Sequence, residues 1–149
     1  IPTEIIDPHY IKKNSLDFEK ELIKVLKLYD IEIICLAGFM KILSKKFIDN
    51  FKDRILNIHP SLLPKYRGLN THARAIASND SIAGCSVHLV TPELDGGPVL
   101  AQSEVVIKKN ETEKSLALKV LFEEHILYPK VLFSFSNQIR KTLDTENCK

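Results

Sequence analysis

Apolar side chains recur every three to four residues over residues 18–29, which is typical of the buried face of an amphipathic helix. Charged side chains are expected outside this face. The face consists of Phe18, Leu22, Val25, Leu26 and Tyr29, and the charged positions outside it are Glu19, Lys20, Lys24 and Lys27. The next run, residues 31–37, is short and almost wholly apolar, which predicts a buried parallel strand.

Helical and strand-like patterns alternate through the rest of the chain. We expect helices from Ser44 onward, over residues 71–78 and from Thr112 onward, and strands over residues 55–58, 84–90 and 99–107. Strands that alternate with helices predict an α/β domain. The strands from residue 84 onward have no helix between them, so this part of the sheet can be antiparallel.

The chain is expected to form one domain over residues 1–149. Residues 1–14 show no clear period and predict an irregular lead-in, and residues 140–149 predict a polar tail. Pro129 is expected to kink the last helix or to begin a new one. Because the sequence begins with Ile1 instead of Met, we expect it to be processed, trimmed or a piece of a longer polypeptide.

The composition narrows the class of protein. Of the 149 residues, 44% are hydrophobic, and a net charge of +2 gives no electrostatic argument for a nucleic-acid partner. No apolar run approaches the roughly 18 residues that cross a bilayer, and no signal-peptide pattern opens the chain, so we expect no membrane partner. The wide spacing of Cys35, Cys85 and Cys148 disfavours a disulfide framework and a zinc site, and it favours a reducing, cytoplasmic location.

Two polar residues interrupt an apolar strand at residues 55–60. Period-two alternation places Asn57 and His59 on one face, and two prolines and a glycine in residues 60–68 then force an ordered loop. Open α/β sheets carry their chemistry at such strand ends. An Asn amide and a protonated His are donors that can stabilise an oxyanion, and a His can also transfer protons near neutral pH. On spacing alone, an ordinary turn before proline remains the alternative.

Asp95 lies in a second polar stretch, residues 91–98. Taken alone, its Asp-Gly pair is typical of a turn. A carboxylate beside an imidazole favours the charged imidazolium, so a catalytic role for Asp95 requires its loop to meet His59. Glu124 lies on the apolar face of the last predicted helix, where an unpaired carboxylate is unfavourable. It therefore pairs internally or binds a polar ligand.

The remaining candidates are weaker. His88 alternates with Ser86 in a predicted strand and is expected to be a hydrogen-bonded structural residue. His72 follows the proline-containing loop, and we expect it at the surface or in support of a site. The spacing of His, Cys and Asp residues disfavours a metal site, and a Gly-x-Ser-x-Gly motif, which would indicate a serine hydrolase, is absent from the sequence.

Five segments together resemble the phosphoribosylglycinamide formyltransferases, the folate-dependent enzymes of purine synthesis. They are residues 36–44 (LAGFMKILS), 56–64 (LNIHPSLLP), 86–91 (SVHLVT), 94–99 (LDGGPV) and 124–129 (EHILYP). They follow the order and spacing of that family over residues 15–135. Methionyl-tRNA formyltransferases look similar in the second segment, and formyltetrahydrofolate hydrolases share its Asn and His and the Asp of the fourth.

The resemblance implies a doubly wound α/β fold, related to the Rossmann fold, with a mostly parallel sheet. It also implies transfer of a formyl group from 10-formyltetrahydrofolate to the amine of glycinamide ribonucleotide, without a metal. The implied catalytic residues are Asn57, His59 and Asp95, and those implied to contact the amine substrate are Gly68 and Glu124. The implied folate pocket consists of Met40, Lys41, Ile42, Leu43, Asn57, Val90, Thr91, Glu93 and Asp95.

The chain departs from the family at the phosphate of the substrate. The family begins with a strand and a Gly-rich loop that holds this phosphate, and none of the five glycines here belongs to such a loop. We therefore expect the N-terminal strand–loop–helix portion to be missing, which leaves an open sheet edge and favours a homodimer. Smaller departures are Lys41 for a frequent Arg, Ser15 for an Arg that approaches the folate, and Asn70 for a frequent His. Two alternative functions stay open: a folate-binding but inactive fragment, and a formyltetrahydrofolate hydrolase, in which water replaces the amine.

Overall fold

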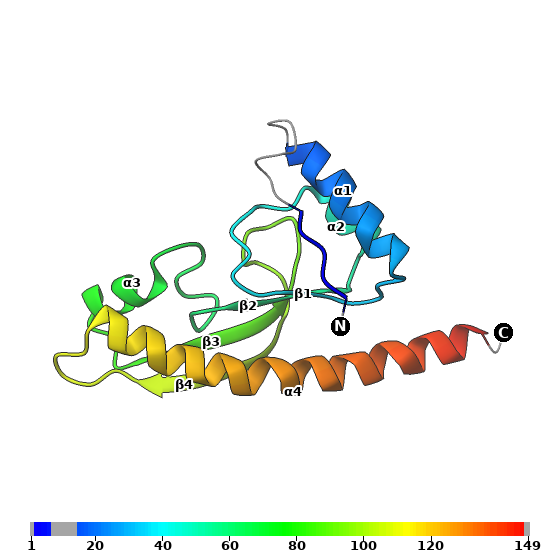
Figure 1. The fold of residues 1–149 in the computed structure, drawn as a ribbon. Coiled ribbons are helices and arrows are strands. Elements are labelled where there is room, and N and C mark those ends of the chain that lie inside the picture. Colours follow the sequence, from blue (N-terminus) through cyan, green and yellow to red (C-terminus); the bar gives the residue numbers. More distant parts are fainter. Residues whose placement is uncertain (1, 7–14, 148–149) are drawn as a thin grey trace.

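A computed structural model describes residues 2–6 and 15–147, and its centre is a four-stranded sheet in the order β1-β2-β3-β4 (Figure 1). The strands are β1 (Ile34–Leu36), β2 (Ile55–His59), β3 (Ile82–Leu89) and β4 (Val99–Val106). β1 and β2 are parallel, whereas β2 and β3, and β3 and β4, are antiparallel. The α/β class is confirmed, but among the described strands the sheet is mixed instead of mostly parallel. Residues 90–98 are too short for a crossover, so β4 returns antiparallel beside β3.

Helices lie on both faces of the sheet, as a doubly wound fold requires (Figure 1). They are α1 (Ser15–Leu28), α2 (Lys45–Asn50), α3 (Thr71–Ala77) and α4 (Glu113–Asn147). Because side chains alternate along a strand, Ile55 faces α2 whereas Ile58 faces α4. The residues Asn57 and His59 share the face of Ile55, which places them on the side of the sheet opposite α4.

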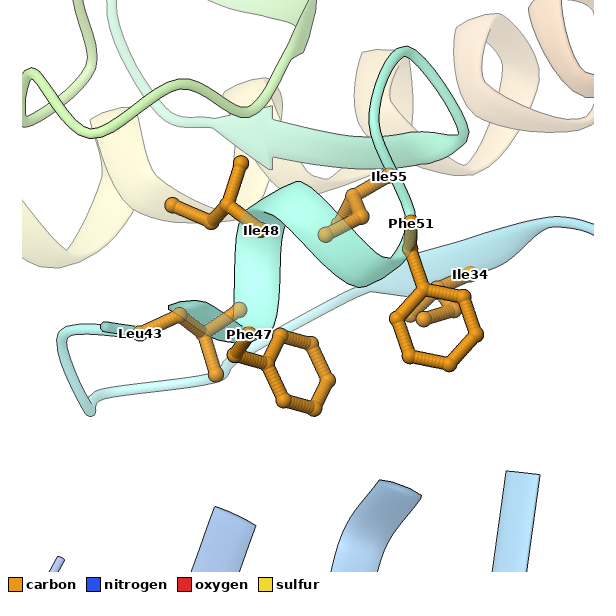
Figure 2. Packing of buried hydrophobic residues seen from close by; sticks show 6 residues of the cluster. All are labelled: Ile34, Leu43, Phe47, Ile48, Phe51 and Ile55. Atoms are coloured by element: carbon orange, nitrogen blue, oxygen red, sulfur yellow. The ribbon is translucent and has the colours of Figure 1, made fainter. Parts of the chain in front are cut away.

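Two apolar clusters hold these layers together. On the α2 side, Phe47 and Phe51 pack with their ring centroids 5.4 Å apart (Figure 2). The buried members of that cluster are Ile34, Leu43, Phe47, Ile48, Phe51 and Ile55. On the α4 side, the buried members are Ala75, Ala83, Cys85, Leu116 and Val120. Ser44 caps the helix that was expected from this residue onward, because its hydroxyl accepts a hydrogen bond from the backbone N–H of Phe47.

Glu19 differs from its sequence expectation. The helical pattern of α1 placed it outside the apolar face, but its residue surface is only 6% exposed. Its carboxylate accepts hydrogen bonds from the backbone N–H of Ser44, at 2.6 Å, and from the Ser44 hydroxyl. The carboxylate thus fastens α1 to the start of α2. Helical periodicity cannot reveal Ser44 as its partner.

The last helix is longer than expected. α4 runs from Glu113 to Asn147 with Pro129 inside it, so Pro129 does not begin a new helix. Of the predicted polar tail, residues 140–147 belong to this helix. Of the predicted lead-in, residues 2–6 are in neither helix nor strand, whereas residues 1 and 7–14 lie outside the described residues. Over the described part of the chain, no helix is long and apolar enough to cross a membrane.

Candidate active site

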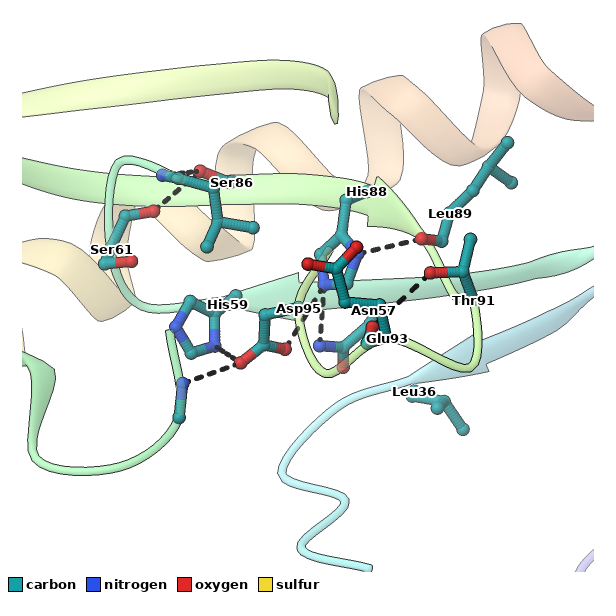
Figure 3. Close-up of polar contacts among 12 residues, drawn as sticks. Leu36, Asn57, His59, Ser61, Ser86, His88, Leu89, Thr91, Glu93 and Asp95 are labelled. Atoms are coloured by element: carbon teal, nitrogen blue, oxygen red, sulfur yellow. Dashed lines mark hydrogen bonds and ion pairs between the residues drawn. The ribbon is translucent and has the colours of Figure 1, made fainter. Parts of the chain in front are cut away.

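Polar side chains from β2 and β3 gather on the face of the sheet opposite α4. The antiparallel register pairs Asn57 with His88 and His59 with Ser86, so all four point to the same face (Figure 3). His59 is 6% exposed and His88 is 2% exposed, so both imidazoles are removed from bulk water. The predicted placement of Asn57 and His59 on one face is confirmed.

Asp95 reaches this group from the loop between β3 and β4. Its backbone adopts a left-handed conformation with φ of 47°, which turns the side chain toward β2 (Figure 3). One carboxylate oxygen, Oδ2, lies 3.5 Å from Nδ1 of His59, and the other, Oδ1, lies 3.6 Å from Nε2 of His88. The backbone N–H of Gly68 donates to Oδ2 at 2.8 Å. The expected contact between the loop of Asp95 and His59 therefore occurs, and the loop that follows β2 also holds Asp95 through Gly68.

Both nitrogens of His59 face oxygen acceptors. Nδ1 faces the Asp95 carboxylate, and Nε2 lies 3.0 Å from the backbone carbonyl of Tyr66. A ring with a proton on each nitrogen satisfies both acceptors, so this geometry suits the imidazolium. Tyr66 is in a left-handed conformation with φ of 56°, in the loop after β2. An oxygen of a bound molecule could take the place of the Tyr66 carbonyl at Nε2.

His88 makes two hydrogen bonds of opposite direction. Its Nδ1 lies 2.9 Å from the carbonyl of Leu89, which can only accept, so Nδ1 carries a proton and donates. Its Nε2 lies 3.1 Å from Nδ2 of Asn57, which can only donate. Burial lowers the pKa of His88, and the hydrogen bond to Leu89 and the charge of Asp95 oppose this only in part. The expected structural role agrees with these bonds, but sequence did not reveal the contacts to Asn57 and Asp95.

The segment expected to line a folate pocket is mostly open. Met40 is 78% exposed and Ile42 is 77% exposed, although both are apolar. Lys41 lies over the ring of Phe18, with its Nζ 5.2 Å from the ring centroid. Leu43, by contrast, is part of the core beneath α2, so its side chain is not free to contact a ligand. Only its backbone is compatible with that role.

Residues 90–95 form the second segment implied for the folate pocket, and this segment includes Asp95 of the polar side-chain group. The Thr91 hydroxyl donates to the backbone carbonyl of Glu93 at 3.4 Å, which closes a turn ahead of Asp95 (Figure 3). Val90 packs against the core on the α2 side. Arg67, from the loop after β2, forms an ion pair with Glu93 and so joins the two loops.

Glu124 stands apart from this group. Among the described residues, no hydrogen bond or ion pair joins it to Asn57, His59 or Asp95. It acts electrostatically on Cys85, whose side chain faces α4, so it lies on the opposite side of the sheet. Burial raises the pKa of Glu124, and the charge of His125 opposes this rise.

A cavity of about 270 Å³ lies under the loop that follows β2. Its lining includes Tyr66, His72 and Asp80. Burial lowers the pKa of His72. Within the described ranges, no group of three or more His, Cys, Asp or Glu side chains is arranged to hold a metal ion.

Comparison with known proteins identifies a family and named relatives. The family described as formyl transferase matches residues 1–132. Phosphoribosylglycinamide formyltransferase of Escherichia coli (strain K12) is 45% identical over 120 residues, which are 80% of this chain and 57% of that protein. The human trifunctional purine biosynthetic protein adenosine-3 is 39% identical over 132 residues, which are 89% of this chain and 13% of that protein.

Solved structures agree with this result. The phosphoribosylglycinamide formyltransferase of Coxiella burnetii, solved in complex with CHES, superposes with a TM-score of 0.82 at 48% identity. The match covers 89% of this chain and 62% of that one. The chain therefore has the fold of these proteins but spans little more than half the length of the bacterial relatives it matches.

Proposed function

The chain belongs to the formyl transferase family, and from this premise we propose that it transfers a formyl group from 10-formyltetrahydrofolate to the amine of glycinamide ribonucleotide, in de novo purine synthesis. The observation that carries the proposal is the contact between His59 and Asp95 beside Asn57 at the end of β2. An acyl transfer of this kind needs donors for an oxyanion and a group that manages protons, and these three side chains can supply both.

In the proposed mechanism, the amine attacks the formyl carbon and the carbonyl oxygen becomes negatively charged. Nε2 of His59 and Nδ2 of Asn57 donate hydrogen bonds to this oxyanion, with the oxyanion replacing the Tyr66 carbonyl at His59. Asp95 keeps His59 in the imidazolium form and orients a water that carries a proton from the attacking amine to the folate nitrogen. When that nitrogen is protonated, the carbon–nitrogen bond to the folate breaks and the formylated amine remains.

The folate is proposed to lie between residues 40–43 and 90–95. The exposed apolar side chains of Met40 and Ile42 support this, because a flat heteroaromatic ring gains from apolar contact on its faces. Polar contacts would come from the backbone of Leu43, Val90 and Thr91, from the side chain of Asn57, and from Glu93 and Asp95. Lys41 is proposed to contact the acidic end of the folate.

The amine substrate is proposed to approach from the side of Gly68. This residue has φ of 78°, a backbone conformation that favours glycine, and its N–H already holds Asp95 in place. The resemblance to the formyltransferases also supports Glu124 as a further contact to that substrate, and its half-buried carboxylate suits a polar ligand, although it lies on the α4 side of the sheet, apart from His59 and Asn57. We also propose a cytoplasmic location, and a homodimer favoured by the open edge of β1, the first strand in the sheet order. No metal, membrane or nucleic acid enters the proposal.

Binding measurements separate the proposal from its alternatives. The protein is titrated by calorimetry with a non-reactive folate analogue and, separately, with glycinamide ribonucleotide. Binding of both supports the transferase, whereas binding of the analogue alone supports an inactive folate-binding fragment. Release of formate from 10-formyltetrahydrofolate without the ribonucleotide would instead support the hydrolase.

A further inference from the structure

We propose that His88 is a positioning residue for Asn57: its unprotonated Nε2 accepts one hydrogen of Asn57 Nδ2, which holds the amide in one of its two orientations. The second hydrogen of Nδ2 is then free to donate to an acceptor in the site. The inference rests on the proposed function only for the identity of that acceptor, which would be the oxygen of the formyl group. The orientation of the amide itself is a property of the unliganded protein.

The direction of the two hydrogen bonds of His88 carries the argument. An imidazole whose Nδ1 donates to the Leu89 carbonyl, at 2.9 Å, has a lone pair on Nε2 when neutral. This lone pair points at Asn57 Nδ2, 3.1 Å away, so the amide must turn its nitrogen toward His88. Oδ1 of Asp95 lies 3.6 Å from the same Nε2 of His88. The amide nitrogen of Asn57 and the Asp95 carboxylate therefore both face this one nitrogen. Figure 3 shows the three side chains converging there.

Protonation of His88 would reverse the arrangement. With a proton on Nε2, His88 could no longer accept a hydrogen bond from Asn57. The protonated Nε2 would instead donate to the Asp95 carboxylate or to Oδ1 of an Asn57 amide turned over. The charged groups that face His88 are Asp95, from the β3–β4 loop, and His59, from β2. Burial lowers the pKa of His88 and so favours the neutral ring; the hydrogen bond to Leu89 and the charge of Asp95 oppose this lowering, and His59 adds to it. The orientation of Asn57 thus depends on a neutral neighbour.

The first test needs no activity. In the 15N-labelled full chain at neutral pH, long-range 1H–15N spectra should show His88 with its proton on Nδ1 and none on Nε2. A proton on Nε2 would overturn the proposal. Because this measurement uses the unmodified protein, it also decides the question if variants at this buried position fail to fold.

The second test uses His88→Phe, which keeps a ring but removes the acceptor, and His88→Gln, which offers a carbonyl acceptor. The Asn57 side-chain amide signals, assigned with Asn57→Asp, should change in the Phe variant and return toward their original positions in the Gln variant. His125→Gln, at an exposed histidine of α4, is the matched control and should leave them unchanged. Asn57 signals that are the same in the Phe variant as in the unmodified protein would overturn the proposal.

The third test connects orientation to rate. If the chain transfers formyl groups, kcat of His88→Phe should fall by at least about 10-fold. The fall should be smaller than the roughly 10²–10³-fold loss that is typical when one oxyanion donor is removed, and KM should change less than about 2-fold. His88→Gln should recover part of the loss. An unchanged kcat in the Phe variant would overturn the positioning role. Absence of formyl transfer in the unmodified protein would count against the proposed function and leave the two spectroscopic tests decisive for His88.

Discussion

The imidazole of His59 and the carboxylate of Asp95 face each other at 3.5 Å, with one residue at the end of β2 and the other in the loop that follows β3. Neither residue is held by this contact alone. The N–H of Gly68 also binds the carboxylate, and the Tyr66 carbonyl binds the far side of the imidazole. Two loops and a strand end are thus fixed around this imidazole–carboxylate pair, which is the arrangement that the proposed chemistry requires.

Replacing Asp95 by Asn removes the charge while keeping the shape and an oxygen acceptor for Gly68. The imidazolium of His59 then loses its counter-charge, so kcat of formyl transfer should fall by about 10²–10⁴, the usual range for a general acid–base group. Steady-state rates with 10-formyltetrahydrofolate and glycinamide ribonucleotide provide the measurement. Asp49→Asn, at an exposed carboxylate of α2, is the control and should retain the original rate. Equal rates for the two variants would contradict the role given to Asp95.

Stability should fall as the solution becomes acidic. Burial lowers the pKa values of His72 and His88 from the ordinary value of 6.5, so the unfolded chain takes up protons at a higher pH than the folded one. The stability from the neutral rings is therefore complete above 6.5 and is lost as the pH falls toward their folded pKa values. Urea midpoints measured from about pH 7.5 to about pH 5.5, above the range of most carboxyl groups, should decrease.

His72→Gln serves as the comparison for that titration. The variant lacks one of the two depressed pKa values, so its midpoint should fall less over the same pH interval. His125→Gln, at an exposed histidine, should follow the unmodified protein. A midpoint that stays constant or rises on acidification would contradict the burial of neutral imidazoles.

Glu19→Ala should destabilise the fold by about 1–3 kcal/mol, because it leaves the Ser44 N–H and hydroxyl without their buried acceptor. Glu21→Ala, in the same helix, removes only an exposed ion pair with Lys24 and should change the free energy of unfolding by less than about 0.5 kcal/mol. Chemical denaturation of the two variants measures the difference. Equal effects would mean that α1 is not fastened to α2 through Glu19.

Phe47→Ala should cost about 3–5 kcal/mol, because this ring is 1% exposed at the centre of the cluster on the α2 side. Phe122 is an equally large side chain on α4 but is 64% exposed, so Phe122→Ala should cost much less. The unfolding free energies of the two variants compare the same deletion in a core and on a surface. Comparable losses would show that the exposed face of α4 is covered in solution.

Local patterns predicted the α/β class, most elements and the shared face of Asn57 and His59, because periodicity encodes which side of an element is buried. They did not predict the direction of β3, since alternation looks the same in parallel and antiparallel strands. The mostly parallel sheet was implied by the resemblance, whereas the described strands form a mixed sheet, and the lack of a helix between the strands from residue 84 onward had allowed its antiparallel part. Local patterns also did not predict the pairing of Asn57 with His88, because this pairing depends on the register between two strands.

The contacts of charged residues were harder to predict than their positions. The sequence around Asp95 by itself predicted only a turn. The expected contact between Asp95 and His59 depended on the resemblance to a known family. Glu19 was assigned to the polar side of α1, because its partner Ser44 is distant in sequence. Glu124 was correctly seen as unusual, but the pattern could not tell that it lies on the α4 side of the sheet, away from Asn57 and His59.

The most direct test of the central claim is the transfer of a labelled formyl group from 10-formyltetrahydrofolate to glycinamide ribonucleotide, by the unmodified protein and by His59→Ala. The proposed mechanism predicts formylated ribonucleotide with the first and a rate lower by about 10²–10⁴ with the second. Formate release without the ribonucleotide, or equal transfer by both proteins, would contradict it.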